Sequence, residues 1–227
     1  MKNSKNIVIS TLVLFAAIVG LVLFLNREEE ETVTETENSV KKHPPIENQP
    51  TIGEGDAPVS IVEFGDYKCP SCKAWGETVY PKLAEEYINT GKAKFSYINV
   101  LFHGKESTLA ALASESVYKQ DPKAFWSFHK AVFDAQPANQ NHDDQWVTPE
   151  KLVELAKAHA PNIDMKQLEE DINTQGTMEE VSKDDQLVKD FSVPFTPTII
   201  INGVMLEDPF DYETIVSLIE KGSVKEK

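Results

Sequence analysis

Two cysteines, Cys69 and Cys72, are the only ones in the 227-residue sequence, and they form a Cys-Pro-Ser-Cys motif. Two thiols at this spacing can exchange a disulfide with another dithiol, but they could also bind zinc or form an inert structural bridge. Zinc needs two further ligands, and the five histidines show no close ligand spacing. A bridge across two intervening residues removes little entropy from the unfolded chain. We therefore favour redox exchange.

The motif lies between a strand and a helix. The run VSIVEF at 59–64 has little alternation of polar and apolar residues, as expected of a strand that is covered on both faces. Pro70 suits the first position of a helix, where its missing N–H costs nothing, so Cys69 lies at the N-cap. The helix is predicted to run to about Tyr87, with a kink at Pro81.

This position predicts different roles for the two thiols. A sulfur at a helix N-terminus faces unpaired N–H groups, which can lower a cysteine pKa from about 8.5 to between about 3.5 and 7.5. Cys69 is therefore the expected attacking thiol. Cys72 lies one turn further on and deeper, which makes it the resolving thiol. The flanking Lys68 and Lys73 either favour the thiolate or, as exposed side chains, serve solubility alone.

Glu63 is a charged residue within the apolar strand. A buried carboxylate is costly, and burial would raise its pKa toward neutrality. We interpret Glu63 as a proton relay for Cys72. The alternative is a glutamate on an edge strand that faces water.

Thr196 and Pro197 precede the apolar run TIII. A proline in this position could be cis, and the Thr196 backbone would then face an extended substrate strand. Composition alone leaves cis and trans equally open.

The remaining sequence predicts an α/β domain that is interrupted by helices. Helix start signals recur at Ser107, Asp121, Thr148 and Asp164, and no comparable strand appears between residues 107 and 190. The aromatic run at 124–133 is assigned to core packing. Strands are predicted at 94–101, 198–202 and 204–206, and a last helix at 212–221.

The N-terminal region predicts a membrane anchor. Residues 7–25 carry no charge, and a helix of that length spans about 28 Å. Lysines at positions 2 and 5 keep residues 1–6 in the cytoplasm, so everything after residue 26 is expected outside. A cleaved signal peptide is the competing interpretation. The acidic segment 26–50 is predicted to be a flexible tether, or alternatively a docking tail.

The acidity of the chain argues against polyanionic partners and is compatible with a bound Ca²⁺. The formal net charge of −15 argues against binding to nucleic acid or to anionic lipid, since both need a basic face. Carboxylates near residues 139–144 could bind a structural Ca²⁺, although no EF-hand pattern is present.

Three segments, FGDYKCPSCKAW, DPKAFWSFHKAVF and VPFTPTIIING, resemble the thioredoxin-like DsbA family, and in particular its membrane-anchored members. The resemblance implies a thioredoxin-like domain at 51–103 and 191–222 and an inserted helical domain at 104–190. It implies Cys69 and Cys72 as the active pair, Pro197 as the cis-proline and Glu63 as the buried carboxylate.

The activity implied by this resemblance is oxidation of dithiols in unfolded secreted proteins, with no cofactor beyond the redox-active disulfide. A quinone-linked membrane oxidase resembling DsbB would reoxidise the pair. Ser71 stands where strongly oxidising members often carry a histidine that helps hold the thiolate. Two other function classes remain: a disulfide reductase or isomerase that uses the same pair, and a non-catalytic binding module.

Overall fold

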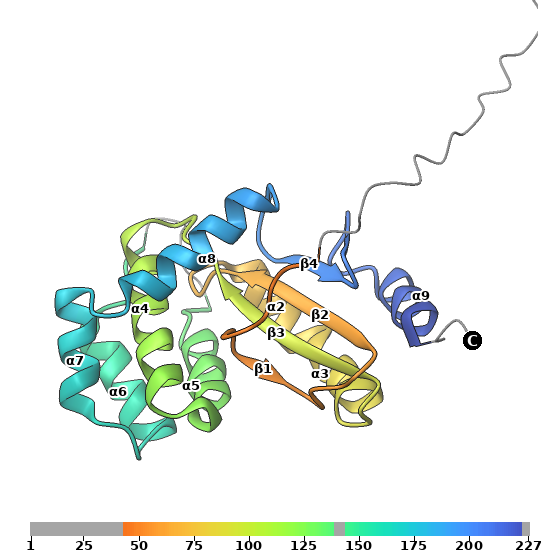
Figure 1. Cartoon of the computed structure of the whole chain (residues 1–227). Coiled ribbons are helices and arrows are strands. Elements are labelled where there is room, and N and C mark those ends of the chain that lie inside the picture. The colour runs from red at the N-terminus through yellow and green to blue at the C-terminus, as the bar shows by residue number, and fades with distance from the viewer. Residues whose placement is uncertain (1–42, 139–143, 224–227) are drawn as a thin grey trace, which may run out of the picture. The chain divides into compact units, whose positions relative to one another are not determined.

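The computed structural model describes residues 43–138 and 144–223. Its centre is a sheet with the strand order β1-β3-β2-β4-β5 (Figure 1). β2 pairs with β3 in parallel, whereas the other neighbouring strands are antiparallel. The strands are β1 (Thr51–Ile52), β2 (Val59–Gly65), β3 (Ala93–Asn99), β4 (Thr198–Ile201) and β5 (Val204–Met205).

β2 is the middle strand, and all of its residues are buried. This explains why its sequence is apolar without alternation, since both faces of the strand are covered. Strands β2 to β5 and the last helix appear where the sequence predicted them. The two-residue β1 at the sheet edge was not predicted because, unlike the equally short β5, it has no Asn-Gly turn that joins it to its neighbouring strand.

The helix after the motif is broken, as Pro81 predicts. α2 (Pro70–Thr78) ends at Val79, and α3 (Tyr80–Leu83) then continues into the π-helical turn η1 (Ala84–Ile88). Pro81 lies in the first turn of α3, where its missing N–H removes no helical bond. α2 is thus a short helix whose N-terminus is held by the end of β2.

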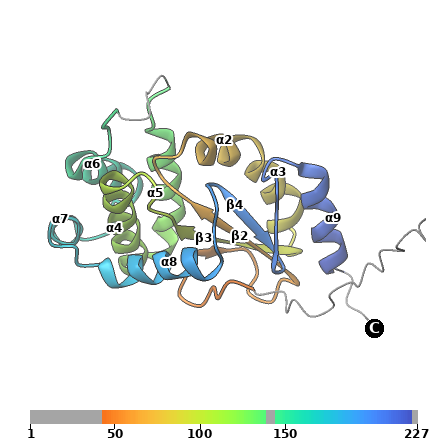
Figure 2. The same ribbon diagram turned by 90° about the horizontal axis from the view of Figure 1, so that it is seen from above.

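Helices cover both faces of the sheet. Figure 2 shows α2 and α3 on one face and α8 (Met178–Asp190) on the other. The first face packs Ile61 and Phe95 against Trp75, together with Ile215 of α9 (Tyr212–Ser223). The opposite face packs strand residues against the end of α8. α2 therefore lies against a solid apolar layer.

An α-helical region separates β3 from β4 in the chain. It contains α4 (Lys105–Gln120), α5 (Pro122–Asp134), α6 (Pro149–His159), α7 (Met165–Thr174) and α8, and α4–α7 gather at one end of the sheet (Figure 1). Asp121, Thr148 and Asp164 cap α5, α6 and α7 as predicted. The predicted start at Ser107 is wrong, because α4 begins at Lys105.

The aromatic run of α5 is largely core, as expected. Phe125, Phe128 and Val132 are fully buried in the cluster that also contains Cys69 and Cys72. The core of the helical region therefore extends to the cysteine pair.

Several predictions concern the N-terminus. The anchor at 7–25 lies outside the described residues, as does most of the tether, and within the described part no helix is both long and apolar enough to cross a membrane. The end of the predicted tether does contact the domain. Pro50 is buried, and the Gln49 Nε2 donates to Asp184 Oδ1 at 2.7 Å. The tether prediction was wrong for these residues, because Gln49 is hydrogen-bonded to α8 and the Pro50 carbonyl oxygen accepts from the Tyr97 N–H of β3.

Candidate active site

Cys69 is the N-cap of α2, and Pro70 is its first residue, as the sequence predicts. Both cysteines are free thiols in this structure. Cys69 is 7% exposed and Cys72 is 1% exposed, so the outer thiol is the first of the pair. A partner thiol can approach Cys69 more readily than Cys72.

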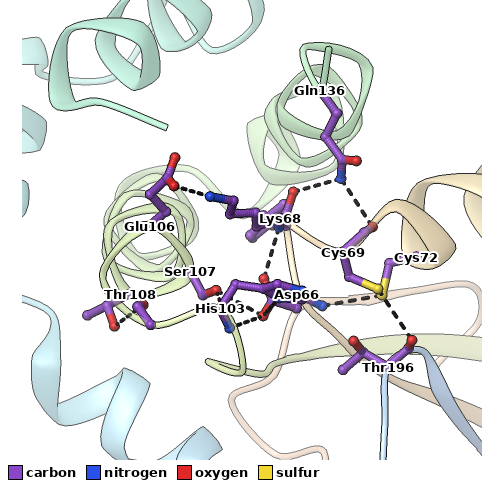
Figure 3. A network of polar contacts seen from close by, with 12 residues as sticks. Asp66, Lys68, Cys69, Cys72, His103, Glu106, Ser107, Thr108, Gln136 and Thr196 are labelled. Carbon is purple, nitrogen blue, oxygen red and sulfur yellow. Dashed lines mark hydrogen bonds and ion pairs between the residues drawn. The ribbon is translucent and has the colours of Figure 1, made fainter. Parts of the chain in front are cut away.

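The Thr196–Pro197 peptide bond is cis, which settles the alternatives that composition left open. The Cys69 Sγ donates to the Thr196 carbonyl oxygen at 3.3 Å, and Figure 3 shows the two groups facing each other. Ser71 is exposed beside them. The loop before β4 therefore forms one wall of the site, next to the accessible sulfur.

The two thiols have opposite electrostatic environments. The pKa of Cys69 is lowered to about 6, above all by a hydrogen bond from the Cys72 thiol. Burial opposes this effect, while Thr196 and the backbone N–H groups of Ser71 and Cys72 support it. Burial raises the pKa of Cys72 well above its usual value, and the bond to Cys69 and the charge of Glu63 act in the same direction. At neutral pH, Cys69 is therefore the thiolate and Cys72 the thiol.

Glu63 lies on β2 between Tyr97 of β3 and Ile199 of β4, in the middle of the sheet. It is 3% exposed, so the alternative of an edge-strand glutamate facing water is wrong. Burial, followed by the charge of Cys69, raises the pKa of Glu63 to about 8. At neutral pH the buried Glu63 side chain therefore carries a proton.

Glu63 and Cys72 share a cavity of about 430 Å³, which we call the Glu63 cavity. Its wall is largely aromatic and includes Trp126, His129 and Phe133 of α5. Burial lowers the pKa of His129 to about 3, so this imidazole is neutral. The charged side chains of Lys73, Glu77, Lys130 and Asp134 also line the cavity.

On the other side of the motif, Asp66 is the centre of a hydrogen-bond network. Its side chain is fully buried and accepts from four donors: the Lys68 N–H at 2.9 Å, the His103 N–H at 3.2 Å, the His103 Nδ1 at 2.8 Å and the Ser107 Oγ at 2.9 Å. Its backbone carbonyl accepts from the Cys69 N–H at 2.9 Å. We call these side chains, together with Lys68 and Glu106, the Asp66 network.

Lys68 is 6% exposed, so the expectation of an exposed lysine was wrong. Its ammonium group pairs with the Glu106 carboxylate of α4. Glu106 also accepts from the N–H groups of Trp146 and Val147. Burial opposes its charge, but Lys68 and these two N–H groups outweigh burial and lower the pKa of Glu106. The ion pair thus joins the motif to the helical region.

Sequence reasoning missed most of this network. The signal was present in part, because Asp66 directly follows β2 and His103 follows β3. Parallel neighbouring strands end at the same edge of a sheet, so polar residues after both strands are expected to meet. Gln136 had no such signal. It comes from the end of α5 and donates to the carbonyl oxygens of Tyr67 and Cys69 at 2.8 and 3.2 Å.

Comparison with known proteins gives a consistent result. A thioredoxin family model matches residues 46–221. Disulfide bond formation protein D of Bacillus subtilis is 44% identical over 184 residues, which is 81% of this chain and 81% of that protein.

Solved structures show the same relationship. The oxidised crystal structure of BdbD from Bacillus subtilis matches with a TM-score of 0.76 at 44% identity, covering 79% of this chain and 95% of that one. Chlamydia trachomatis DsbA matches with a TM-score of 0.68 at 25% identity, covering 79% of this chain and 94% of the other.

Proposed function

The chain belongs to the thioredoxin family and is a DsbA-like protein thiol:disulfide oxidoreductase, and we propose that Cys69 and Cys72 carry out its oxidation of protein dithiols. The observation that carries this proposal is the contrast between the two thiols. The pKa of Cys69 is lowered to about 6, whereas the pKa of Cys72 is raised. A stabilised Cys69 thiolate favours the reduced form of the pair, which makes the disulfide form an oxidant.

The reaction begins from the Cys69–Cys72 disulfide. A substrate thiolate attacks the Cys69 sulfur, the bond between the two cysteines breaks, and Cys72 leaves with the electron pair. The second substrate thiolate then attacks the substrate sulfur of the mixed disulfide, and Cys69 leaves as a thiolate. The substrate has lost two electrons and gained a disulfide, while the enzyme holds a dithiol.

Glu63 supplies the proton that Cys72 needs on leaving. A thiolate at the position of Cys72 would be buried, which is unfavourable. Glu63 lines the same cavity and is protonated at neutral pH, since its pKa is raised to about 8. A general acid with a pKa near the working pH transfers protons efficiently.

The cis-proline loop orients the substrate. The Thr196 carbonyl oxygen lies 3.3 Å from the Cys69 Sγ and accepts a hydrogen bond from it. Thr196 and Pro197 place the backbone of the loop before β4 beside the reacting sulfur, where a substrate strand can add to it. Pro70 begins the helix that lowers the Cys69 pKa, and Ser71 contributes its backbone N–H to the same effect.

The test is oxidation of a reduced, unfolded model protein by the full-length chain. Cys69→Ala should abolish turnover. Cys72→Ala cannot form the internal disulfide and should not oxidise the reduced protein. With the oxidised model protein, however, its Cys69 thiolate should attack the substrate disulfide and accumulate a mixed disulfide, visible after acid quenching. Thr174→Ala, an exposed change on α7, is the control. Turnover by Cys69→Ala would contradict the proposal and favour a binding module.

The reduction potential decides the direction of electron flow. We expect the Cys69/Cys72 pair to equilibrate with glutathione near or above about −180 mV, as protein oxidants do. A value near about −270 mV would instead favour a reductase.

We propose further that the enzyme works outside the cytoplasm on secreted or surface proteins. Stable protein disulfides form mainly in oxidising compartments, where such an oxidant has substrates. The uncharged segment 7–25, with lysines before it and glutamates after it, supports a single membrane anchor with the catalytic domain outside. A membrane-impermeant maleimide should therefore label Cys69 in intact reduced cells, and labelling only after lysis would contradict this location.

A membrane oxidase resembling DsbB is the proposed source of oxidising equivalents. The dithiol must lose two electrons after each turnover, and a quinone in the membrane can accept them. Membranes from the producing cells should reoxidise the reduced enzyme, and extraction of their quinones should stop this. Reoxidation at an unchanged rate after extraction would exclude a quinone-linked partner.

A structural Ca²⁺ remains a proposal without assigned ligands. Most of the acidic loop considered for it lies outside the described residues, and within those residues no group of three His, Cys, Asp or Glu side chains is placed to hold a metal ion. The acidity of the chain supports the idea in general terms. Equal melting temperatures in Ca²⁺ and in chelator would refute it.

A further inference from the structure

We propose that His103, held by Asp66, supplies a positive charge that favours the Cys69 thiolate, and so acts as a positioning residue for the redox pair. This inference rests on the proposed function of Cys69. The inner dipeptide of the motif contains Pro70 and Ser71, neither of which can be charged. The charge comes instead from the segment between β3 and α4, which is distant in sequence and adjacent in space (Figure 3).

Asp66 holds the imidazole in place. The His103 Nδ1 donates to Asp66 Oδ2 at 2.8 Å, and the His103 backbone N–H donates to the same oxygen at 3.2 Å. Ser107 adds a third bond to Oδ2 at 2.9 Å. All four partners of the Asp66 side chain are donors, which suits a carboxylate and an imidazolium facing each other.

The same Asp66 is joined to both cysteines through its backbone. Its carbonyl oxygen accepts from the Cys69 N–H at 2.9 Å, and its N–H donates to the Cys72 Sγ at 3.4 Å. His103 and the cysteine pair are therefore both hydrogen-bonded to Asp66, His103 through the carboxylate and the cysteines through the backbone. Protein shields this connection from water, because Asp66 is fully buried and the His103 side chain is 15% exposed.

The other charges that face His103 are compensated or exposed. They are Asp66, Lys68 and Cys69 from the turn before α2, and Lys105 and Glu106 from the first turn of α4. The Lys68 charge is paired with Glu106 inside the protein. Lys105 is exposed, so water screens it. The His103–Asp66 pair is thus the titratable pair that faces the motif from inside the protein.

The effect must be mutual. The hydrogen bond to Asp66 raises the pKa of His103, burial lowers it, and the charges of Asp66 and the Cys69 thiolate raise it further. If the thiolate favours the imidazolium, the imidazolium favours the thiolate by the same free energy. The larger contributions to the Cys69 pKa are the hydrogen bond from Cys72, burial and the hydrogen bond with Thr196, followed by the backbone N–H groups of the helix N-terminus, so His103 adjusts this pKa rather than setting it.

Two variants separate charge from shape. In His103→Gln the charge is lost, and we expect the Cys69 pKa, measured by thiolate absorbance of the full-length chain, to rise by about 0.5 unit. The glutathione equilibrium at pH 7 should shift about threefold toward the disulfide, which is about 14 mV. In His103→Lys the charge is kept, and both values should stay near those of the unmodified chain. His159→Gln, an exposed change on α6, is the control.

A measurement on the unmodified chain does not depend on how a variant folds. By reciprocity, the His103 pKa, followed by its Cε1–H nuclear magnetic resonance, should be about 0.5 unit higher in the dithiol form than in the disulfide form. The resonance that is absent from the spectrum of His103→Gln is assigned to His103.

Two results would overturn the inference. One is an equal His103 pKa in both redox forms, and the other is a Cys69 pKa that is the same in His103→Gln and His103→Lys. If turnover still requires Cys69, neither result contradicts the proposed function. Turnover by Cys69→Ala would refute the proposed function itself, whatever the His103 variants show.

Discussion

Two buried carboxyl groups lie near the N-terminus of α2, that of Asp66 and that of Glu63, and their hydrogen-bonding environments are opposite. In the Asp66 network, the Asp66 side chain accepts hydrogen bonds from four donors. In the Glu63 cavity, Glu63 lies on β2, three residues before Asp66, and none of the described residues donates a hydrogen bond to its side chain. Instead, it faces a largely aromatic space of about 430 Å³.

This difference gives the two carboxyl groups different uses. Donors that surround a carboxylate offset the cost of removing it from water, so Asp66 can serve as a fixed charge that holds a loop. A carboxyl without donors keeps its proton, so Glu63 can store and release one. Cys69 and Cys72 follow these two carboxyl groups in the chain, and the environment of each thiol fits the role that we propose for it.

The largest expected effect is on the Asp66 network. Asp66→Ala removes the carboxylate that accepts from the His103 imidazole, the Ser107 hydroxyl and the backbone N–H groups of Lys68 and His103. We expect the free energy of unfolding to fall by about 4 kcal/mol, as when one partner of a buried charged network is removed. Denaturant unfolding measures this, with Asp185→Ala, a change at a half-exposed carboxylate on α8, as the control. A loss below about 1 kcal/mol would show that the network does not stabilise the fold.

Glu63→Gln should remove a loss of folding stability that grows as the pH rises. Because the pKa of Glu63 is about 8 in the folded chain and 4.5 in the unfolded chain, the folded state binds this proton more tightly. Stability therefore falls as the pH rises from about 4.5 to about 8. Between pH 5 and pH 8.5, the free energy of unfolding should fall less in the variant than in the unmodified chain, by on the order of 3 kcal/mol.

The same variant should slow turnover by about 100-fold, since it cannot give Cys72 a proton. The exposed Glu154→Gln on α6 is the control for both measurements. An unchanged pH dependence of unfolding would contradict the buried, protonated state of Glu63. Unchanged turnover would contradict its role as a relay.

The smallest expected effect is the difference in stability cost between replacing Lys68 and replacing Lys73, the two lysines that flank the motif. Lys68→Met leaves the buried Glu106 with two backbone donors and no cation, and should cost about 2 kcal/mol. Lys73 is half-buried and donates to the carbonyl oxygens of Asp134 and Gln136, so Lys73→Met should cost less than about 0.5 kcal/mol. Equal costs in denaturant unfolding would show that burial does not distinguish the two.

Sequence patterns predicted the elements that depend on neighbouring residues. The central strand, the cap at Cys69 and the starts of three later helices follow from local hydrophobicity, capping residues and prolines. Ser107 shows where this reasoning fails. Its hydroxyl has the chemistry of a helix cap, but Asp66, 41 residues earlier, accepts its hydrogen bond instead.

The residues of the candidate site also fall into two groups, those whose geometry the local sequence predicted and those that the tertiary structure decided. Cys69, Cys72 and Pro70 were predicted with their geometry, since they are adjacent on one helix turn. Glu63 was predicted with two alternatives, and the strand order decided between them. The cis form of the bond before Pro197 was equally open, because composition does not determine it.

By itself, the sequence determined that this chain has two cysteines at the start of a helix, because a four-residue motif and the strand before it contain that information. The tertiary structure alone decided which carboxyl group is surrounded by donors, which lysine is buried and which histidine lies beside the pair. The physical reason is that burial and hydrogen-bond partners come from residues far apart in sequence, such as Lys68 and Glu106. The chemistry of the motif is local, whereas its protonation states depend on the whole fold.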